Sequence, residues 1–262
     1  MHRSDPFHRG VIVRRLAALL LVAFPAVAAA QSPRRSIDEY SAWLAYTGIH
    51  PISKDWRVQI EGQWRQTEGW SQPQQRLFRT ALLRVLSPTV RVGAGYAVTR
   101  TNPPEEFVVD AQPFNEHRAY QQLDLRQQTG PVLWDHRYRL EQRWGERLST
   151  AGADRGERLG WTYTNRARYF LRTTMAPGGG APETGESYFV AYDEVFVNFG
   201  SQVRNNVFDQ NRLFVGAGHR FRPTFGMEAG YLSQIVLRGN GTDVERNHTL
   251  LIALFSEFPL RR

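Results

Sequence analysis

Apolar and polar residues alternate one by one along most of the chain beyond residue 40. Neighbouring residues on a β-strand point to opposite faces, so a strand over residues 132–144 has one apolar and one ionic face. Residues 56–65 alternate in the same way without a fault. This pattern fits a soluble β-sandwich with its ionic face in water. It also fits the wall of a membrane β-barrel, which has lipid outside and a polar lumen inside. On residues 132–144 the apolar face carries Trp134, Tyr138, Leu140 and Trp144, and the ionic face carries Asp135, Arg137, Arg139, Glu141 and Arg143.

The connections between the predicted strands favour the barrel. Short connections at residues 50–55, 87–89, 128–131 and 222–223 alternate with long ones at residues 67–74, 101–115, 148–157, 199–209 and 239–246. Short turns at one end and long loops at the other are typical of outer-membrane barrels. The connection at residues 177–185 is an exception, because it falls among the short turns in the alternation but is itself long. The pattern gives eleven strands, but bacterial single-chain barrels have even numbers, so we expect ten or twelve and favour twelve.

The pairing of residues 116–127 with residues 132–146 can be predicted from their apolar faces. If these faces coincide, paired residue numbers sum to about 259, which places Glu116 opposite Arg143 and Arg118 opposite Glu141. The same register sets Asp124 against Asp135, which is unfavourable unless Arg126 or Arg137 intervenes.

The first thirty residues have the pattern of a secretory signal peptide. Arg14 and Arg15 precede an apolar run over residues 16–27, which ends in small residues at 28–30. We therefore expect a cleaved signal peptide at residues 1–30 and an N-terminal periplasmic or lumen segment at 31–40. The outer-membrane barrel domain would follow at 41–262. The chain has no cysteine, which excludes a disulfide framework and thiol chemistry.

The charge of the chain comes almost entirely from arginine. The net charge is +8, and Lys54 is the single lysine. Such a basic chain raises nucleic acid as a partner. Here, however, the arginines alternate with apolar residues instead of clustering, and the chain is predicted to be exported. We therefore expect no nucleic-acid partner, and we place the arginines in the lumen or against acidic lipid headgroups. Beyond residue 30 no apolar run approaches the length of a transmembrane helix.

A glycine-rich phrase occurs near residues 91–96, 214–219 and 227–231. A phosphate-binding loop needs a helix after its glycines, and none is predicted there. Glycines that face inward in curved strands are the plainer interpretation.

The order of these segments resembles a family of Gram-negative outer-membrane proteins known as domain of unknown function 2490. The resemblance covers essentially the whole chain after the signal peptide, and its most specific segments are residues 193–198 and 208–221. The resemblance implies an outer-membrane β-barrel, but it implies no particular biochemical activity. Such barrels commonly end on an aromatic residue. Here Phe258 precedes four further residues, so it would have to act as the signal to the barrel-assembly machinery from an internal position.

Catalytic and metal sites are not indicated. A lipid hydrolase needs a Ser, a His and an acidic or amide residue within hydrogen-bond reach on one face. His219 and Ser233 share the apolar face, but around the turn at 222–223 they should face Gly226 and Arg212. His248 and Ser256 lie eight residues apart on one strand. The histidines are scattered without a carboxylate pair at ligand spacing. We expect no enzyme activity, no cofactor and no metal.

The ionic faces predict a charged lumen. For Glu194, two interpretations stay open: a structural pair with lumen arginines, or part of a binding or transport site. One function is a small pore or carrier whose arginine-rich lumen favours small anionic solutes. The alternative is a closed structural or interaction barrel that acts through its extracellular loops; a lipid-modifying hydrolase is the third. Both leading functions place the protein in the cell outer membrane, with lipid as a partner. The predicted lumen charge cluster contains Arg57, Glu61, Arg118, Arg137, Arg139, Glu141, Arg143, Arg166, Arg168, Glu194 and Arg212.

Overall fold

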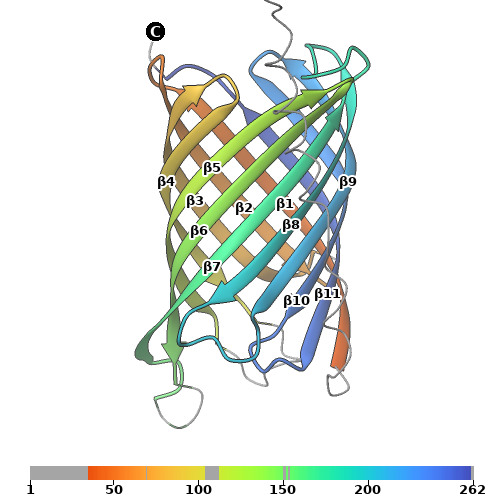
Figure 1. The fold of residues 1–262 in the computed structure, drawn as a ribbon. Coiled ribbons are helices and arrows are strands. Elements are labelled where there is room, and N and C mark those ends of the chain that lie inside the picture. The colour runs from red at the N-terminus through yellow and green to blue at the C-terminus, as the bar shows by residue number, and fades with distance from the viewer. Residues whose placement is uncertain (1–34, 69, 104–111, 150–151, 153, 261–262) are drawn as a thin grey trace, which may run out of the picture. The chain divides into compact units, whose positions relative to one another are not determined.

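Eleven strands form a closed barrel in which each strand is hydrogen-bonded to its neighbours in the sequence (Figure 1). The structure is a computed structural model that describes residues 35–68, 70–103, 112–149, 152 and 154–260. No helix in this part of the chain is long and apolar enough to cross a membrane. The strands are β1 (Arg35–Pro51), β2 (Trp56–Thr67), β3 (Gln72–Ser87), β4 (Val90–Thr101), β5 (Phe114–Thr129), β6 (Val132–Leu148), β7 (Arg158–Met175), β8 (Ser187–Phe199), β9 (Phe208–Arg222), β10 (Phe225–Leu237) and β11 (Asp243–Ser256).

The barrel is closed by a parallel pair, β1 with β11. In an up-and-down barrel with an odd number of strands, the first and last strands run in the same direction, so the closing pair has to be parallel. The favoured count of twelve strands is therefore wrong, and the eleven segments seen in the alternation are the eleven strands of the described residues.

Two predicted boundaries also differ from the structure. Residues 35–40, expected to precede the barrel, belong to β1, and β3 begins at Gln72 inside the predicted loop. The expected signal peptide and residues 31–34 lie outside the described residues.

The two ends of the barrel differ in their connections. One end, here called the short-turn end, carries the connections at residues 52–55, 88–89, 130–131, 176–186 and 223–224. The opposite, long-loop end carries the others, including residues 102–113 and 149–157. Residues 176–186 form the long exception that the sequence indicated. This connection folds onto the neighbouring turns, because Gly180 donates to the carbonyl of Pro131 and Gly185 to that of Arg220.

The hairpin of β5 and β6 has a different register from the predicted one. Thr129 pairs with Val132, so only Gly130 and Pro131 form the turn, and Gly130 has a φ of 57° that suits glycine. The whole pairing is thereby displaced by two residues, which leaves every side chain on its predicted face. Arg118 lies opposite Arg143 instead of Glu141, and Glu116 lies opposite Gly145. The unfavourable Asp124–Asp135 pair is avoided, because these residues face Arg137 and Arg126.

Apolar side chains fill part of the interior. Phe214 and Leu232 have no exposed surface and pack with Trp43, Tyr188 and other inward residues of β1 and β8–β11. Leu83 and Tyr120 form a second buried cluster with Ala81. These side chains occupy interior space that water does not reach.

The inward glycines make room for these interior side chains. A Cβ at Gly218 would lie 2.3 Å from the ring of Tyr188, so the ring lies directly on the backbone of β9. The interpretation of the repeated phrase as inward glycines is therefore confirmed.

Candidate functional site

Ten of the eleven residues predicted to form the lumen charge cluster face the interior. Arg137 and Arg143 are half-buried, and the other eight have less than a tenth of their surface exposed. Arg57 is the one that the structure places elsewhere. Its guanidinium donates to the backbone carbonyls of Ser53, Lys54 and Trp56 and so holds the turn between β1 and β2.

A continuous chain of alternating charges lines part of the lumen. Glu141 has no exposed surface, and its two carboxylate oxygens lie 2.6 Å from Arg166 and 2.6 Å from Arg168. Arg168 bridges onward to Glu194 at 2.6 Å, so Glu194 faces inward. The chain contains, in spatial order, Arg118, Glu116, Arg143, Asp209, Arg166, Glu141, Arg168, Glu194 and Arg212, and Arg137 also lies 3.5 Å from Glu194. Because these residues belong to β5–β9, the chain ties five neighbouring strands together along the inner wall.

The predicted cluster missed several members. Glu116 was named only in the hairpin pairing, yet its carboxylate holds Arg118 at 2.5 Å and Arg143 at 2.7 Å. Asp209, expected in a loop, lies in β9 and binds Arg166 at 2.7 Å. Arg79 comes from a strand whose faces look mixed in the sequence, and it pairs with Glu61 at 2.6 Å. Leu77, Arg79, Ala81 and Leu83 are every second residue of β3 and share its inner face, and this alternation was the signal that could have found Arg79. Nothing in the local pattern marks Asp209.

Aromatic faces, as well as carboxylates, support the arginines. The ring of Phe196, with 1% of its surface exposed, has three guanidinium carbons within 5.1 Å of its centroid, those of Arg166, Arg168 and Arg212. Trp43 has Arg65 at 3.9 Å and Arg212 at 5.2 Å. Cation–π contacts strengthen when they are shielded from water. The barrel can therefore hold more guanidinium groups than it has carboxylates nearby.

Some of these arginines are incompletely satisfied. Arg65 donates to Gln63, and Arg139 donates through Nε to Gln122. Within the described residues, both terminal nitrogens of Arg139 and the Nε of Arg212 are buried without a hydrogen-bond partner. Buried donors without a partner are costly. The Arg139 guanidinium lies instead over the ring of Tyr120, 4.7 Å from its centroid.

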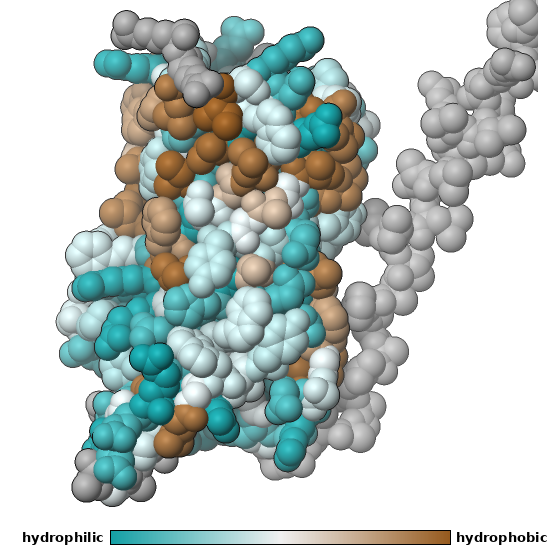
Figure 2. Space-filling model, turned by 90° about the vertical axis from the view of Figure 1, so that its left-hand side faces the viewer, coloured by the Kyte–Doolittle hydropathy of each residue, from teal (hydrophilic) through white to brown (hydrophobic). Residues whose placement is uncertain are grey.

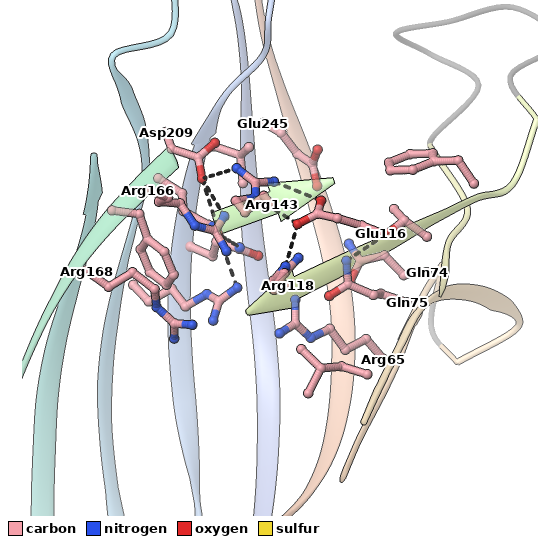
Figure 3. A pocket seen from close by; sticks show the side chains of 18 of the residues that line it. Arg65, Gln74, Gln75, Glu116, Arg118, Arg143, Arg166, Arg168, Asp209 and Glu245 are labelled. Carbon is pink, nitrogen blue, oxygen red and sulfur yellow. Dashed lines mark hydrogen bonds and ion pairs between the residues drawn. The ribbon is translucent and has the colours of Figure 1, made fainter. Parts of the chain in front are cut away.

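Residues of this network line a cavity of about 180 Å³. Figure 3 shows Arg65, Arg118 and Arg143 directed into the same space. Residues at the ends of β4 and β5, among them Asn102 and Phe114, border the cavity, so it lies toward the long-loop end. Eight arginines and three acidic residues line it. Its walls therefore carry an excess of positive charge.

Four histidines, His117, His136, His219 and His248, lie on the outer wall, whereas His50 is buried near the short-turn end, where its Nδ1 contacts the carbonyl of Phe258. His219 faces Met227 and Ser233 faces Leu213, each one residue from the predicted Gly226 and Arg212, because the turn lies at residues 223–224 and a bulge near Phe225 moves the register back by one. The two residues are thus several positions apart, as argued from the sequence. His219 instead contacts the hydroxyl of Ser187 at 2.9 Å.

His248 has both ring nitrogens engaged. Its Nδ1 contacts the Tyr231 hydroxyl at 2.6 Å, and its Nε2 lies 3.5 Å from Asp38. Within the described residues, no group of three His, Asp or Glu side chains is arranged to hold a metal.

The fold and its interior define the molecule as an eleven-stranded β-barrel with an arginine-rich, internally paired lumen. The chain belongs to the protein family of unknown function DUF2490, whose model matches residues 40–245. The family expected from the sequence is thereby confirmed. No curated protein matches the chain, and no solved structure does.

Proposed function

We propose that this protein is an outer-membrane β-barrel that takes small anionic solutes into its lumen from the long-loop end. The observation that carries the proposal is the cavity lined by eight arginines and three acidic residues. A cavity whose walls have a low dielectric constant and an excess of one sign of charge concentrates ions of the opposite sign. Arg65 and Arg212 contribute positive charge that no nearby carboxylate fully neutralises, because Arg65 is bonded to Gln63 and Arg212 lies 3.7 Å from Glu194.

The outer wall supports a membrane location. Large apolar and aromatic side chains such as Trp64, Phe78 and Leu82 point outward, each with 45% or more of its surface exposed. On the face drawn in Figure 2, apolar side chains gather in the half of the barrel near the short-turn end, and hydrophilic ones cover the other half. Soluble proteins rarely expose so much apolar surface in one band. In this proposal the short turns face the periplasm and the long loops face outward.

A closed interaction barrel is the second candidate, and a specific observation favours it. Leu83, Phe214 and Leu232 are completely buried inside the barrel, so side chains occupy at least part of the lumen at their levels. A solute that enters the cavity would pass only if these side chains moved. Under this alternative the anion cavity is a binding site, and the long loops carry the contacts with partners.

Conductance in a planar lipid bilayer separates the two candidates. With a tenfold KCl gradient, a pore of the proposed kind gives a reversal potential displaced toward that of chloride. The variant with Arg65, Arg118 and Arg212 all changed to Gln should lose most of this preference. Arg126→Gln, which removes an arginine from an exposed pair with Asp135, is the control and should behave like the wild type.

Two results would overturn the pore. One is conductance whose preference is unchanged by the triple substitution. The other is the absence of conductance from protein that is folded and inserted, as judged by a gel mobility that changes on boiling. A protein found in the soluble periplasmic fraction, with no mobility change, would overturn the membrane location itself.

A further inference from the structure

Two arginines on the outer wall face each other directly. Arg76 on β3 pairs with Arg100 on β4, and both side chains are exposed. Like charges directly opposite each other on neighbouring strands are destabilising. The Arg76 guanidinium lies over the ring of Trp64 at 5.5 Å, and Arg100 donates to Asn115 at 3.4 Å. Among the described residues, neither arginine forms an ion pair with a carboxylate.

A groove of about 290 Å³ lies beside the two arginines on the same wall. Phe78 and Val98 line it, with 52% and 37% of their surfaces exposed. His117 closes one side, where its Nδ1 contacts the hydroxyl of Tyr96 at 2.7 Å. The groove therefore combines a doubly cationic edge with an apolar wall.

The height of this pair on the barrel can be judged from a second arginine on β3. Arg84 lies over Trp56 at 5.9 Å, just as Arg76 lies over Trp64. Eight residues separate the two arginines, and at about 3.3 Å per residue and a tilt of roughly 40° they differ by roughly 20 Å in height. The apolar band of a membrane barrel is about 25 Å tall and is flanked by aromatic girdles. The two Trp–Arg pairs thus fit the two interfaces, with Arg76 and Arg100 at the long-loop one.

We propose that Arg76 and Arg100 bind the phosphate of a membrane lipid, whose acyl chain follows the groove along Phe78 and Val98. One phosphate between the two guanidinium groups would supply a counter-charge to both through charge-assisted hydrogen bonds. A lipid fits better than free phosphate, because a free ion would leave the apolar groove open to water. This inference rests on the proposed membrane location, but it does not depend on what the lumen carries.

Native mass spectrometry of the detergent-extracted protein tests the proposal. The probes are dioleoyl phosphatidic acid, dioleoylglycerol as its phosphate-free counterpart, and inorganic phosphate. We expect one tightly retained phosphatidic acid, and at least tenfold weaker binding in the variant that carries both Arg76→Gln and Arg100→Gln. Dioleoylglycerol should not be retained, and inorganic phosphate at equal concentration should not displace the lipid.

Arg84→Gln is the matched control. It removes an outward arginine from the same strand and from the same kind of contact with a tryptophan, but Arg84 faces Val92 on β4 where Arg76 faces Arg100. This variant should retain phosphatidic acid as the wild type does. Equal retention in the Arg76/Arg100 double variant would overturn the site, as would retention of dioleoylglycerol. Displacement by inorganic phosphate would assign the arginines to a free ion instead of a lipid.

The gel-mobility change on boiling is measured on every variant, so that a loss of lipid is not mistaken for a loss of fold. Failure of the conductance experiment alone would leave the lipid site standing. If the wild-type protein were found outside the membrane fraction, both the proposed function and the lipid site would be overturned.

Discussion

The carboxylate of Glu141 lies 2.6 Å from the guanidinium of Arg166 at a place in the lumen that water does not reach. The same carboxylate holds Arg168 through its other oxygen. One acidic residue on β6 therefore anchors two arginines of β7, and through them it joins the two halves of the charge chain.

Changing Glu141 to Gln should destabilise the barrel strongly. Removing one partner of a buried ion pair leaves an uncompensated charge, which typically costs about 3–5 kcal/mol. Urea unfolding of the folded protein in lipid vesicles measures this change. Asp135→Asn is the control, because the Arg126–Asp135 pair is partly exposed and such pairs contribute about 0–1 kcal/mol. A cost as small as that of the control would show that the lumen chain does not stabilise the fold.

Changing Gly218 to Ala should lower the stability or the yield of folded barrel. The added Cβ would meet the ring of Tyr188 at 2.3 Å, so either the ring or strand β9 must move. Overpacking of this kind costs about 1–3 kcal/mol. Gly62→Ala provides the comparison, since a Cβ at Gly62 meets no atom within 4 Å. Equal thermal stability of the two variants in detergent would mean that the Tyr188 ring does not lie on the backbone.

A pair of cysteines placed across the seam should form a disulfide. Ala45 on β1 is the register partner of Ala253 on β11, and the chain has no cysteine of its own. A mild oxidant should therefore cross-link Ala45→Cys with Ala253→Cys, detected as a mobility change that a reductant reverses. The control pair, Leu44→Cys with Ala253→Cys, has its side chains on opposite faces and should stay reduced. Cross-linking of the control instead would place the strands in a different register.

Single cysteines should report the orientation of the barrel. In the proposed orientation, a cysteine at Ser201 in the 200–207 loop reacts with a membrane-impermeant maleimide on intact cells. A cysteine at Thr89, in the turn between β3 and β4, reacts only after the cells are opened. Both residues are exposed, so access to the cell exterior is the difference that the labelling measures. The reverse labelling pattern would show that the barrel has the opposite orientation in the membrane.

The sequence predicted most of the wall, because each inward or outward choice depends on neighbouring residues only. The turns are marked by Gly and Pro, and the ionic face of β6 reads directly from residues 135–143. Ten cluster residues therefore face the lumen as expected.

Features that depend on distant pairing were harder to predict. The parallel seam joins Arg35 to Asp243, and no local signal fixes that pairing. Asp209 entered the network because the pairing of β8 with β9 shifts near Val197. Arg57 occupies a lumen-facing position in the strand alternation, but it lies so close to the first turn that its guanidinium donates to backbone carbonyls there. The alternation thus predicts on which face of the wall a side chain lies, and only the three-dimensional register shows which residue it contacts.

The odd number of strands limits how the chain can be rearranged. Strand β1 starts at the long-loop end, whereas the chain leaves β11 at the short-turn end, near the C mark in Figure 1. In an even-stranded barrel a linker of a few residues could join the two termini into a circular permutant. Here such a linker would have to span the full height of the barrel. Reporter domains fused before β1 and after β11 would accordingly lie at opposite ends of the barrel, and so on opposite sides of the membrane in the proposed location.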